Sequence, residues 1–281
     1  MMAVTPEALL EKCPDLTTLP SVYHKLNEAI NSPSCTTGII SRIISQDPIL
    51  TIKVLKMVNS AFYGFPHEID DIPQAIVIIG MQQLNDLVLT HSIINLFDNQ
   101  KSTPFTLEDF WKFSLASGIE AKILATQSKG KFSERIFVGG LLHNIGKLIM
   151  AIAEPELYIS CRELSTSEEV SMTIAEKSIF GYSHVEVNRA IMNSWKIPQM
   201  INDLSSNYLS PQQSSFLSEC DLIRLAHIMV QTTGLGNNGD FFIPEFSDQS
   251  LDDLNLTLAA LEESLIDLKG QFSEICTTFL N

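Results

Sequence analysis

The apolar residues of this chain recur mainly at intervals of three and four, the spacing that places them on one face of an α-helix. Val22, Leu26 and Ile30, for example, follow one another at intervals of four. The sequence shows neither the apolar–polar alternation of half-buried strands nor a repeat of fixed period. The pattern therefore predicts an all-α fold in which roughly a dozen helices pack their apolar faces together.

Capping residues and prolines locate the starts of these helices. Thr5 precedes Pro6 and Asp47 precedes Pro48, so each pair combines a capping side chain with proline at the first helical position. Proline also disfavours helical backbone at the residue before it, which separates the helix at Pro48 from its predecessor. In the first part of the chain, these signals predict a short helix from Thr5 and helices over residues 22–30, 34–46, 48–59, 73–80 and 81–97.

A polar stretch over residues 99–104 is the predicted linker between two helical subdomains, residues 1–100 and 101–281. Beyond it, Thr106 and the acidic residues that follow open a helix that extends to about residue 127. The later predicted helices are one opened by Ser133 that carries residues 139–147, three beginning at Ser167, Ser183 and Pro198, one over 215–232, and one or two acidic amphipathic helices within 250–280.

Composition narrows the class of protein. Hydrophobic residues make up 45% of the 281 residues and charged residues 18%, which is sufficient for a buried core. The chain carries 18 basic and 33 acidic side chains, a formal net charge of −15. Such a surface repels phosphate backbones and anionic lipids, so neither a nucleic acid nor a membrane is an expected partner.

The cysteines and the apolar runs indicate the compartment. The five cysteines are widely spaced and form no Cys-x-x-Cys pair, which is typical of reduced thiols in the cytosol. Apolar runs such as residues 75–81 are far shorter than the ~20 residues that span a bilayer, and the start of the chain does not resemble a signal peptide. We expect a soluble cytoplasmic protein.

Two stretches of sequence resemble a known family. The first comprises residues 46–51 (QDPILT) and 59–64 (NSAFYG), which together look like the N-terminal signature of the HDOD family, the "HD-related output domain". The second, residues 140–147 (GLLHNIGK), is similar to the Leu-Leu-His-Asp-Ile-Gly-Lys stretch of HD-type metal phosphohydrolases and their HDOD relatives. Residues 180–187 and 195–198 fit the same family in the same order, so the resemblance covers residues 16–211.

The resemblance implies an HD-like fold of two packed helical subdomains and a role in bacterial signal transduction. It also implies partners among signalling proteins, such as response-regulator or cyclic-dinucleotide pathway components. In this interpretation, residues of the first signature form the family motif and an interaction surface: Asp47, Pro48, Asn59, Ser60, Phe62, Tyr63 and Gly64. The structural alternative is that Asn59 satisfies backbone groups at a helix end while Phe62 and Tyr63 wedge between the subdomains.

The HD-type metal site that the resemblance implies is degenerate in this sequence. An HD-type hydrolase uses a His, an adjacent His-Asp pair and a later Asp around divalent metals that convert water to hydroxide. His143 is retained, but its partner is the neutral Asn144, and Phe113 stands where the first His is expected. Tyr208-Leu209 replaces a His-His pair, and His227 takes the place of the late Asp.

The consequence of these losses is large. A bound zinc-type metal lowers the pKa of water from about 15.7 to about 7, so losing it removes roughly eight orders of magnitude of hydroxide near neutral pH. We therefore expect no catalytic residue and no cofactor, and a non-catalytic module that acts through protein–protein interaction. The alternative is a metal-dependent phosphohydrolase that acts on a phosphate ester or cyclic nucleotide through a rearranged His site.

The candidate site residues each have two interpretations. As a vestigial site, His143, Asn144, His184 and His227 would bind a divalent transition metal, and Lys147 would bind an anion. As structural residues, His143 would be half-buried on a backbone carbonyl or on Asn144, and His184 would lie at a helix start or on the surface. His227 would lie in the core, and Lys147 would be solvated near a helix end. The acidic C-terminal helices are predicted to be a solvated face, with a homodimer contact as the alternative.

Overall fold

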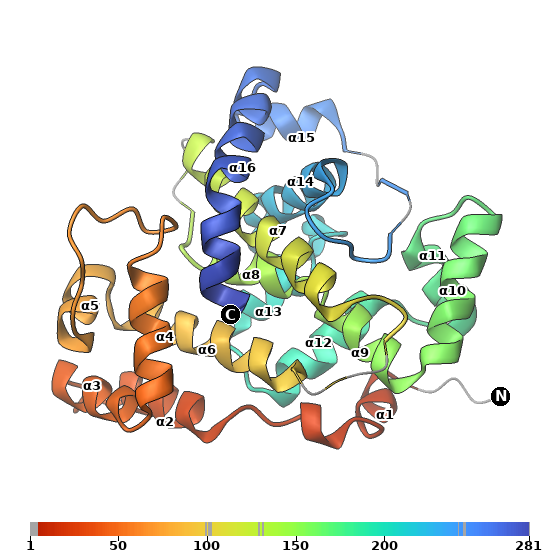
Figure 1. Cartoon of the computed structure of the whole chain (residues 1–281). Coiled ribbons are helices and arrows are strands. Elements are labelled where there is room, and N and C mark those ends of the chain that lie inside the picture. Colours follow the sequence, from red (N-terminus) through yellow and green to blue (C-terminus); the bar gives the residue numbers. More distant parts are fainter. Residues whose placement is uncertain are drawn as a thin grey trace. The chain divides into compact units, whose positions relative to one another are not determined.

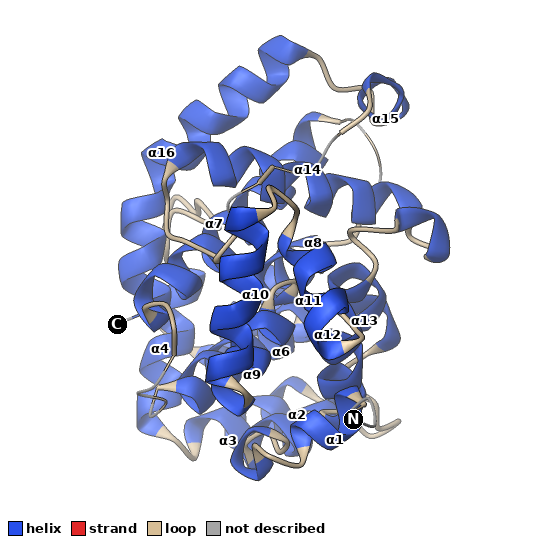
Figure 2. Cartoon of the chain, turned by 90° about the vertical axis from the view of Figure 1, so that its right-hand side faces the viewer, coloured by secondary structure: helices blue, strands red, loops and turns tan. Residues whose placement is uncertain are grey.

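The structure, a computed structural model, describes residues 5–98, 100, 103–128, 130, 132–240, 242–243 and 246–280. Within these ranges the chain consists of helices joined by turns and loops, and no strand occurs (Figure 2). The prediction of an all-α fold is confirmed.

The chain divides into two compact units (helices labelled in Figure 1). The first contains Met1–Thr18 and Asn99–Leu268, and the second contains Leu19–Asp98 and Lys269–Asn281. The predicted subdomains, residues 1–100 and 101–281, therefore differ from these units at both ends of the chain. Of the predicted linker, residues 99, 101 and 102 lie outside the described residues.

Long-range contacts explain the difference. Near the N-terminus, the indole Nε1 of Trp195 donates a hydrogen bond of 2.8 Å to the carbonyl oxygen of Leu16, within the first unit. Near the C-terminus, the rings of Phe62 and Phe279 lie 6.2 Å apart within the second unit. Neither contact joins residues that are close in sequence, so local patterns gave no sign of them.

The second unit is built mainly from short helices, and α4 is capped by Asp47 as predicted. Its helices are α2 (Ser21–Ile30), α3 (Thr37–Ser45), α4 (Pro48–Val58), α5 (Ile72–Ile79), α6 (Met81–Phe97) and the last part of α16 (Leu258–Leu280). The carboxylate of Asp47 accepts hydrogen bonds from the amides of Ile49 and Leu50 at the start of α4. Gly80, with φ of 86°, provides the sharp turn from α5 into α6.

The first unit contains the longer helices and the buried polar residues. Its elements are α1 (Pro6–Leu10), η1 (Pro14–Leu16), α7 (Leu107–Gln127), α8 (Ile136–Leu142), α9 (Ile145–Ala153), α10 (Pro155–Ser167), α11 (Met172–Phe180), α12 (His184–Ser194), α13 (Gln199–Ser206), η2 (Pro211–Gln213), α14 (Leu217–Thr233), α15 (Asp248–Asp253) and the first part of α16. Glycines let α7 and α8 approach closely, since a Cβ on Gly140 would lie 2.9 Å from the Cα of Gly118.

Two helix predictions in the first unit were wrong. The single helix predicted from Ser133 is two helices, α8 and α9, that break at His143 and Asn144. A helix start was predicted at Ser167, but Ser167 ends α10, which begins at Pro155. The true start is at Ser171, whose hydroxyl accepts a hydrogen bond of 3.4 Å from the amide of Ile174. A serine followed by acidic residues can stand at the end of a helix as well as at its start, and the sequence alone did not distinguish the two cases.

The apolar helices are core helices. Among the described residues, Ile136–Ala153 has the length and composition to cross a bilayer, but this segment is mostly buried inside the protein. The pair α5 and α6 meets the same criterion only as a broken span, bent by 114°. Burial of this kind is typical of core helices in a soluble protein.

Candidate functional site

A cluster of polar side chains lies inside the first unit, and we call it the core polar cluster. Its members come from the α8–α9 break, four helices and two loops. Its members are His143, Asn144, Lys147, Glu176, His184, Tyr208, His227 and Asp240. The side chains of Lys147 and Glu176 are fully buried, and that of Asp240 is 11% exposed.

One half of the cluster is a line of hydrogen bonds through two imidazoles. Nδ1 of His143 lies 2.5 Å from the carbonyl oxygen of Gly140, and its Nε2 lies 2.8 Å from Nδ1 of His227. A carbonyl oxygen can only accept a hydrogen bond, so Nδ1 of His143 carries the proton and donates it. In the neutral ring, Nε2 therefore has no proton and accepts a hydrogen bond. Nδ1 of His227 therefore donates to His143, which fixes the tautomers of both rings.

A buried ion pair, formed by Lys147 and Asp240, lies next to His227. Nζ of Lys147 lies 2.5 Å from Oδ2 of Asp240, and the amide of Asn238 donates to the same oxygen at 2.9 Å. Burial alone would raise the pKa of Asp240, but the Lys147 ammonium outweighs it and holds this pKa below its ordinary value. Asp240 is therefore a carboxylate, and Lys147 supplies the positive charge that it requires.

Both imidazoles in this half are neutral near pH 7. Burial lowers the pKa of His143 well below its ordinary value, and the neighbouring His227 lowers it further. Burial also lowers the pKa of His227, although Asp240, 3.4 Å from its Nε2, opposes that shift. Burial prevails because Lys147 already neutralises the carboxylate at shorter range.

The other half of the cluster is centred on His184. Its Nδ1 lies 2.6 Å from Oε2 of Glu176, and its backbone amide donates to the same oxygen at 2.9 Å. Its Nε2 lies 2.8 Å from the hydroxyl of Tyr208, which also contacts Oδ1 of Asn144 at 3.3 Å. Tyr208 thereby links the side chain of Asn144 to that of His184.

Some buried polar atoms beside these bonds have no partner among the described residues. They are Nδ2 of Asn144, Oε1 of Glu176 and the hydroxyl of Tyr158. Unsatisfied buried groups cost roughly 1–3 kcal/mol each. Ordered water is a common way to satisfy such groups in polar interiors.

The residues present do not fit a divalent metal. Among the described residues, no group of three His, Cys, Asp or Glu side chains is arranged so that it could hold an ion. His143 and His184 have both ring nitrogens in hydrogen bonds within the protein. The ring of Phe113, at the position where the resemblance implied a histidine ligand, lies 5.3 Å from that of His227.

The structure brings the predicted site residues close together, but their hydrogen-bond partners are not those that the sequence indicated. His143, Asn144, His184 and His227 lie in one cluster, and His143 bonds a backbone carbonyl as its structural interpretation proposed. Two parts of the structural interpretation were wrong. His143 is fully buried, not half-buried, with an exposed fraction of 0%, and His184 is not on the surface, with an exposed fraction of 1%. The prediction that Lys147 is solvated was also wrong, because its side chain is buried and pairs with the carboxylate of Asp240.

Sequence reasoning missed Asp240 and Glu176. Asp240 follows the glycine-rich loop after α14, and no helical spacing relates it to His143 or Lys147. Glu176 lies eight residues before His184 with a helix end between them. An acidic residue on an otherwise buried helix face was the one signal available for Glu176.

The residues of the family motif lie in the second unit and secure a turn. The side-chain amide of Asn59 donates to the carbonyl oxygens of Leu55 and Ile69, and its Oδ1 accepts from the amide of Ile69 at 2.8 Å. Asn59 therefore ties the end of α4 to the end of the loop that leads into α5, and it satisfies backbone groups at a helix end as its structural interpretation proposed. Gly64 has φ of 62°, a left-handed conformation that favours glycine.

The aromatic residues of this motif pack on one another. The rings of Phe62 and Tyr63 lie 5.0 Å apart edge to face, and Tyr63 stacks on Phe65 at 5.8 Å. Phe65 is 36% exposed. The motif thus combines an asparagine that secures a turn with aromatic rings that are partly exposed.

Comparison with known proteins identifies a family and a fold. The sequence profile of the HDOD domain matches residues 16–210, more than two-thirds of the chain. An "Uncharacterized protein" of Treponema pallidum (strain Nichols) is 26% identical over 207 residues, covering 73% of this chain. The chain spans 40% of the length of that relative.

Several solved structures share the fold. A "Putative phosphohydrolase" from Shewanella amazonensis SB2B superposes with a TM-score of 0.73 at 24% identity, covering 96% of this chain and 97% of that one. An HDOD domain protein of unknown function from Geobacter sulfurreducens gives 0.71 at 22% identity, covering 93% and 91%. A "Putative signal transduction protein" from Marinobacter aquaeolei VT8 gives 0.71 at 18% identity, covering 94% and 59%. At these identities the likeness is one of fold.

Proposed function

The chain belongs to the HDOD family, and from that premise we propose that it is a non-catalytic signal-transduction module that acts through protein–protein interaction. The observation that carries the proposal is the buried pair of Lys147 and Asp240 beside His227. A carboxylate that would otherwise favour a bound cation is already neutralised by a lysine of the same chain.

The charge balance of the pocket supports the same conclusion. The HD-type pair contributes a carboxylate next to its His, whereas Asn144 contributes a neutral amide that contacts Tyr208. A divalent ion placed among neutral imidazoles and an ammonium would meet repulsion from Lys147 without a free carboxylate pair to offset it. Hydroxide activation by such an ion is therefore not expected.

Signalling proteins of response-regulator or cyclic-dinucleotide pathways are the expected partners, in the cytoplasm. The name of the Marinobacter protein is consistent with this context. The exposed aromatic part of the motif at residues 62–65 offers a contact of the type enriched at protein interfaces.

A second candidate function is metal-dependent phosphohydrolysis of a phosphate ester or cyclic nucleotide. Two observations favour it: His143, His184 and His227 lie in one cluster, and the name of the Shewanella protein states such an activity. It would require the ion pair and the tyrosine bonds to open before a metal could bind.

The experiment that separates the two functions combines metal analysis with turnover. The purified whole chain is assayed for bound metal, and then for hydrolysis of bis(p-nitrophenyl) phosphate and a cyclic dinucleotide with manganese, iron or nickel. We expect no metal-dependent turnover in the wild type, in His143→Ala or in the control His67→Ala, which alters an exposed histidine of the second unit. Turnover that requires metal and disappears only in His143→Ala would establish the hydrolase instead.

The interaction itself is tested by capture of partners on the immobilised whole chain. We expect a response-regulator or cyclic-dinucleotide pathway protein to be retained by the wild type and by His67→Ala, and to be lost with Tyr63→Ala. Equal retention by all three would place the contact away from the motif and contradict this interaction surface.

A further inference from the structure

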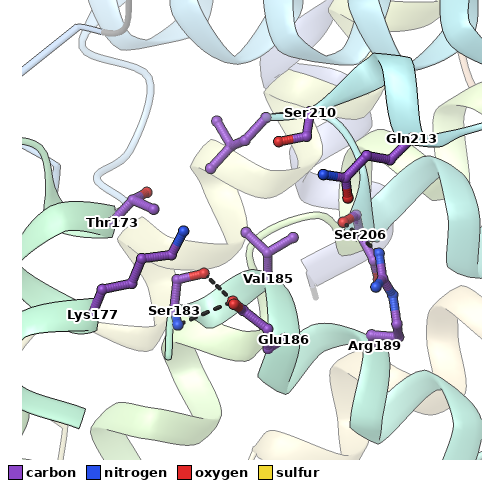
Figure 3. A pocket seen from close by; sticks show the side chains of 10 residues that line it. Thr173, Lys177, Ser183, Val185, Glu186, Arg189, Ser206, Ser210 and Gln213 are labelled. Carbon is purple, nitrogen blue, oxygen red and sulfur yellow. Dashed lines mark hydrogen bonds between the residues drawn. The ribbon is translucent and has the colours of Figure 1, made fainter. Parts of the chain in front are cut away.

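A second polar site lies on the surface of the first unit, away from the bonds of the core polar cluster. A cavity of about 340 Å³ opens between α11, α12, α13 and η2 (Figure 3). Two basic side chains line it, Lys177 from α11 and Arg189 from α12. Polar neutral groups complete the lining, among them Ser183, Ser206, Ser210 and Gln213.

Two cations and one carboxylate, Glu186, line this cavity, and Lys177 acts electrostatically on Glu186. The ammonium of Lys177 makes no hydrogen bond or ion pair with any described residue, and Figure 3 shows it extended into the cavity. The guanidinium of Arg189 donates to Oδ1 of Asn207 at 2.7 Å and to the carbonyl oxygen of Ser206 at 3.4 Å, both neutral acceptors. These two bonds orient the guanidinium on the side of the cavity opposite Lys177.

One carboxylate lines the cavity, and it is held by the start of α12. Oε2 of Glu186 accepts hydrogen bonds from the backbone amide of Ser183, at 3.0 Å, and from the Ser183 hydroxyl. Burial alone would raise the pKa of Glu186, but the bonds from Ser183 outweigh it and lower this pKa. The cavity therefore carries two fixed positive charges and one negative charge.

A cationic cavity is unexpected in a chain with a formal net charge of −15. Two cations that face one cavity beside a single carboxylate give the cavity a net positive charge and concentrate positive potential there. The physical consequence is attraction of an anion into the cavity.

We propose that this cavity binds a small phosphate monoester that carries hydroxyl groups. A planar guanidinium and an ammonium on opposite sides suit the several acceptor oxygens of a phosphate, and serine hydroxyls add neutral donors. The volume exceeds that of a phosphate ion, so an organic body is accommodated against Val185 and Leu209. The Glu186 carboxylate accepts hydrogen bonds from hydroxyl groups of that body.

The proposal is tested by calorimetric titration of the whole chain at low ionic strength. The probes are glycerol 3-phosphate, inorganic phosphate and glycerol, used with the wild type, Lys177→Gln, Arg189→Gln and the control Lys56→Gln. Lys56 is an exposed lysine of α4 in the second unit, so its replacement changes the net charge equally. Circular dichroism verifies that each variant is folded.

We expect saturable binding of glycerol 3-phosphate to the wild type, weaker binding of inorganic phosphate, and none of glycerol. Each cavity variant is expected to weaken binding about tenfold, the loss of roughly one charge-assisted hydrogen bond. Lys56→Gln should bind like the wild type. Absence of saturable binding, or equal affinities in Lys177→Gln and the wild type, would overturn the proposal whatever the outcome of the phosphodiesterase assay.

Discussion

Lys147 is a charged residue inside the protein, and an ion pair makes its burial possible. An ammonium group that is fully buried loses most of its hydration, and this loss is tolerable only beside a compensating charge. Asp240 provides that charge, and Asn238 and His227 surround the same carboxylate oxygen. The pair makes the loop after α14 part of the core.

Removal of the lysine alone should therefore be severely destabilising. Lys147→Met retains the length of the side chain but leaves Asp240 with an uncompensated charge, and we expect a loss of about 3–5 kcal/mol in the free energy of unfolding. Urea titration followed by circular dichroism measures this loss. Lys112→Met, which breaks an exposed pair with Glu108, should cost less than about 1 kcal/mol.

The double variant Lys147→Met/Asp240→Asn distinguishes the charge effect from loss of packing. Neutralising both partners should recover a substantial part of the stability, since no bare charge remains buried. A double variant as unstable as the sum of the single variants would indicate that the ion pair is not the source of the effect.

At the scale of helices, close approach depends on small residues at crossing points. Gly146 of α9 faces the start of α12, where an added Cβ would overlap the His184 carbonyl oxygen and lie 2.9 Å from the amide nitrogen of Asn188. The amide of Gly146 also donates to Oδ1 of Asn188 at 3.1 Å. This contact brings His184 beside the α8–α9 break and so assembles the core polar cluster.

Gly146→Ala should force α9 and α12 apart and lower the free energy of unfolding by about 3 kcal/mol or more, since backbone atoms cannot yield as a flexible side chain does. The matched variant is Gly270→Ala in α16, where no atom lies within 4 Å of the added Cβ. It should leave stability unchanged or raise it by up to about 1 kcal/mol, because alanine favours helix. Similar effects of the two substitutions in thermal unfolding would contradict the crossing geometry.

At the scale of the whole molecule, a buried carboxyl group couples stability to pH. Glu120 of α7 is fully buried, and its contact with a described residue is a 2.6 Å hydrogen bond from the Ser264 hydroxyl. Burial raises the pKa of Glu120 to about 7, against an ordinary value of 4.5, and Asp267 adds to the increase while Ser264 opposes it. The ionised form of Glu120 therefore opposes folding.

The direction of the pH effect follows from this shift. Below pH 4.5, Glu120 is protonated in both the folded and the unfolded chain and contributes no penalty. As the pH rises toward 7, only the unfolded chain readily releases this proton, so stability falls, and above about 7 the full penalty is present. Its upper bound is roughly 3 kcal/mol, at about 1.4 kcal/mol per pKa unit.

Glu120→Gln should accordingly stabilise the protein at pH 8 by about 1–3 kcal/mol and have little effect near pH 4.5, as measured by urea titration across this range. Glu262→Gln removes the same charge at an exposed position of α16 and serves as the control. A gain of equal size in both variants would attribute the effect to net charge instead of burial.

The sequence by itself determined the features that depend on near neighbours. Thr5, Asp47 and Thr106 each cap the helix that they were predicted to start, because a capping bond joins residues two or three positions apart. Helical periodicity fixed the all-α class, and two motifs carried the resemblance to the HDOD family. The same motifs located His143, Asn144 and Lys147 and indicated which metal ligands are replaced.

Only the tertiary structure decided which buried polar groups contact one another. Asp240 reaches Lys147 from 93 residues along the chain, and Tyr208 reaches Asn144 from 64 residues, distances over which no local pattern extends. The same holds for Lys177 and Arg189, which line one cavity from two different helices. The sequence specifies which chemical groups are present, but the packing of the helices determines which group neutralises a given charge.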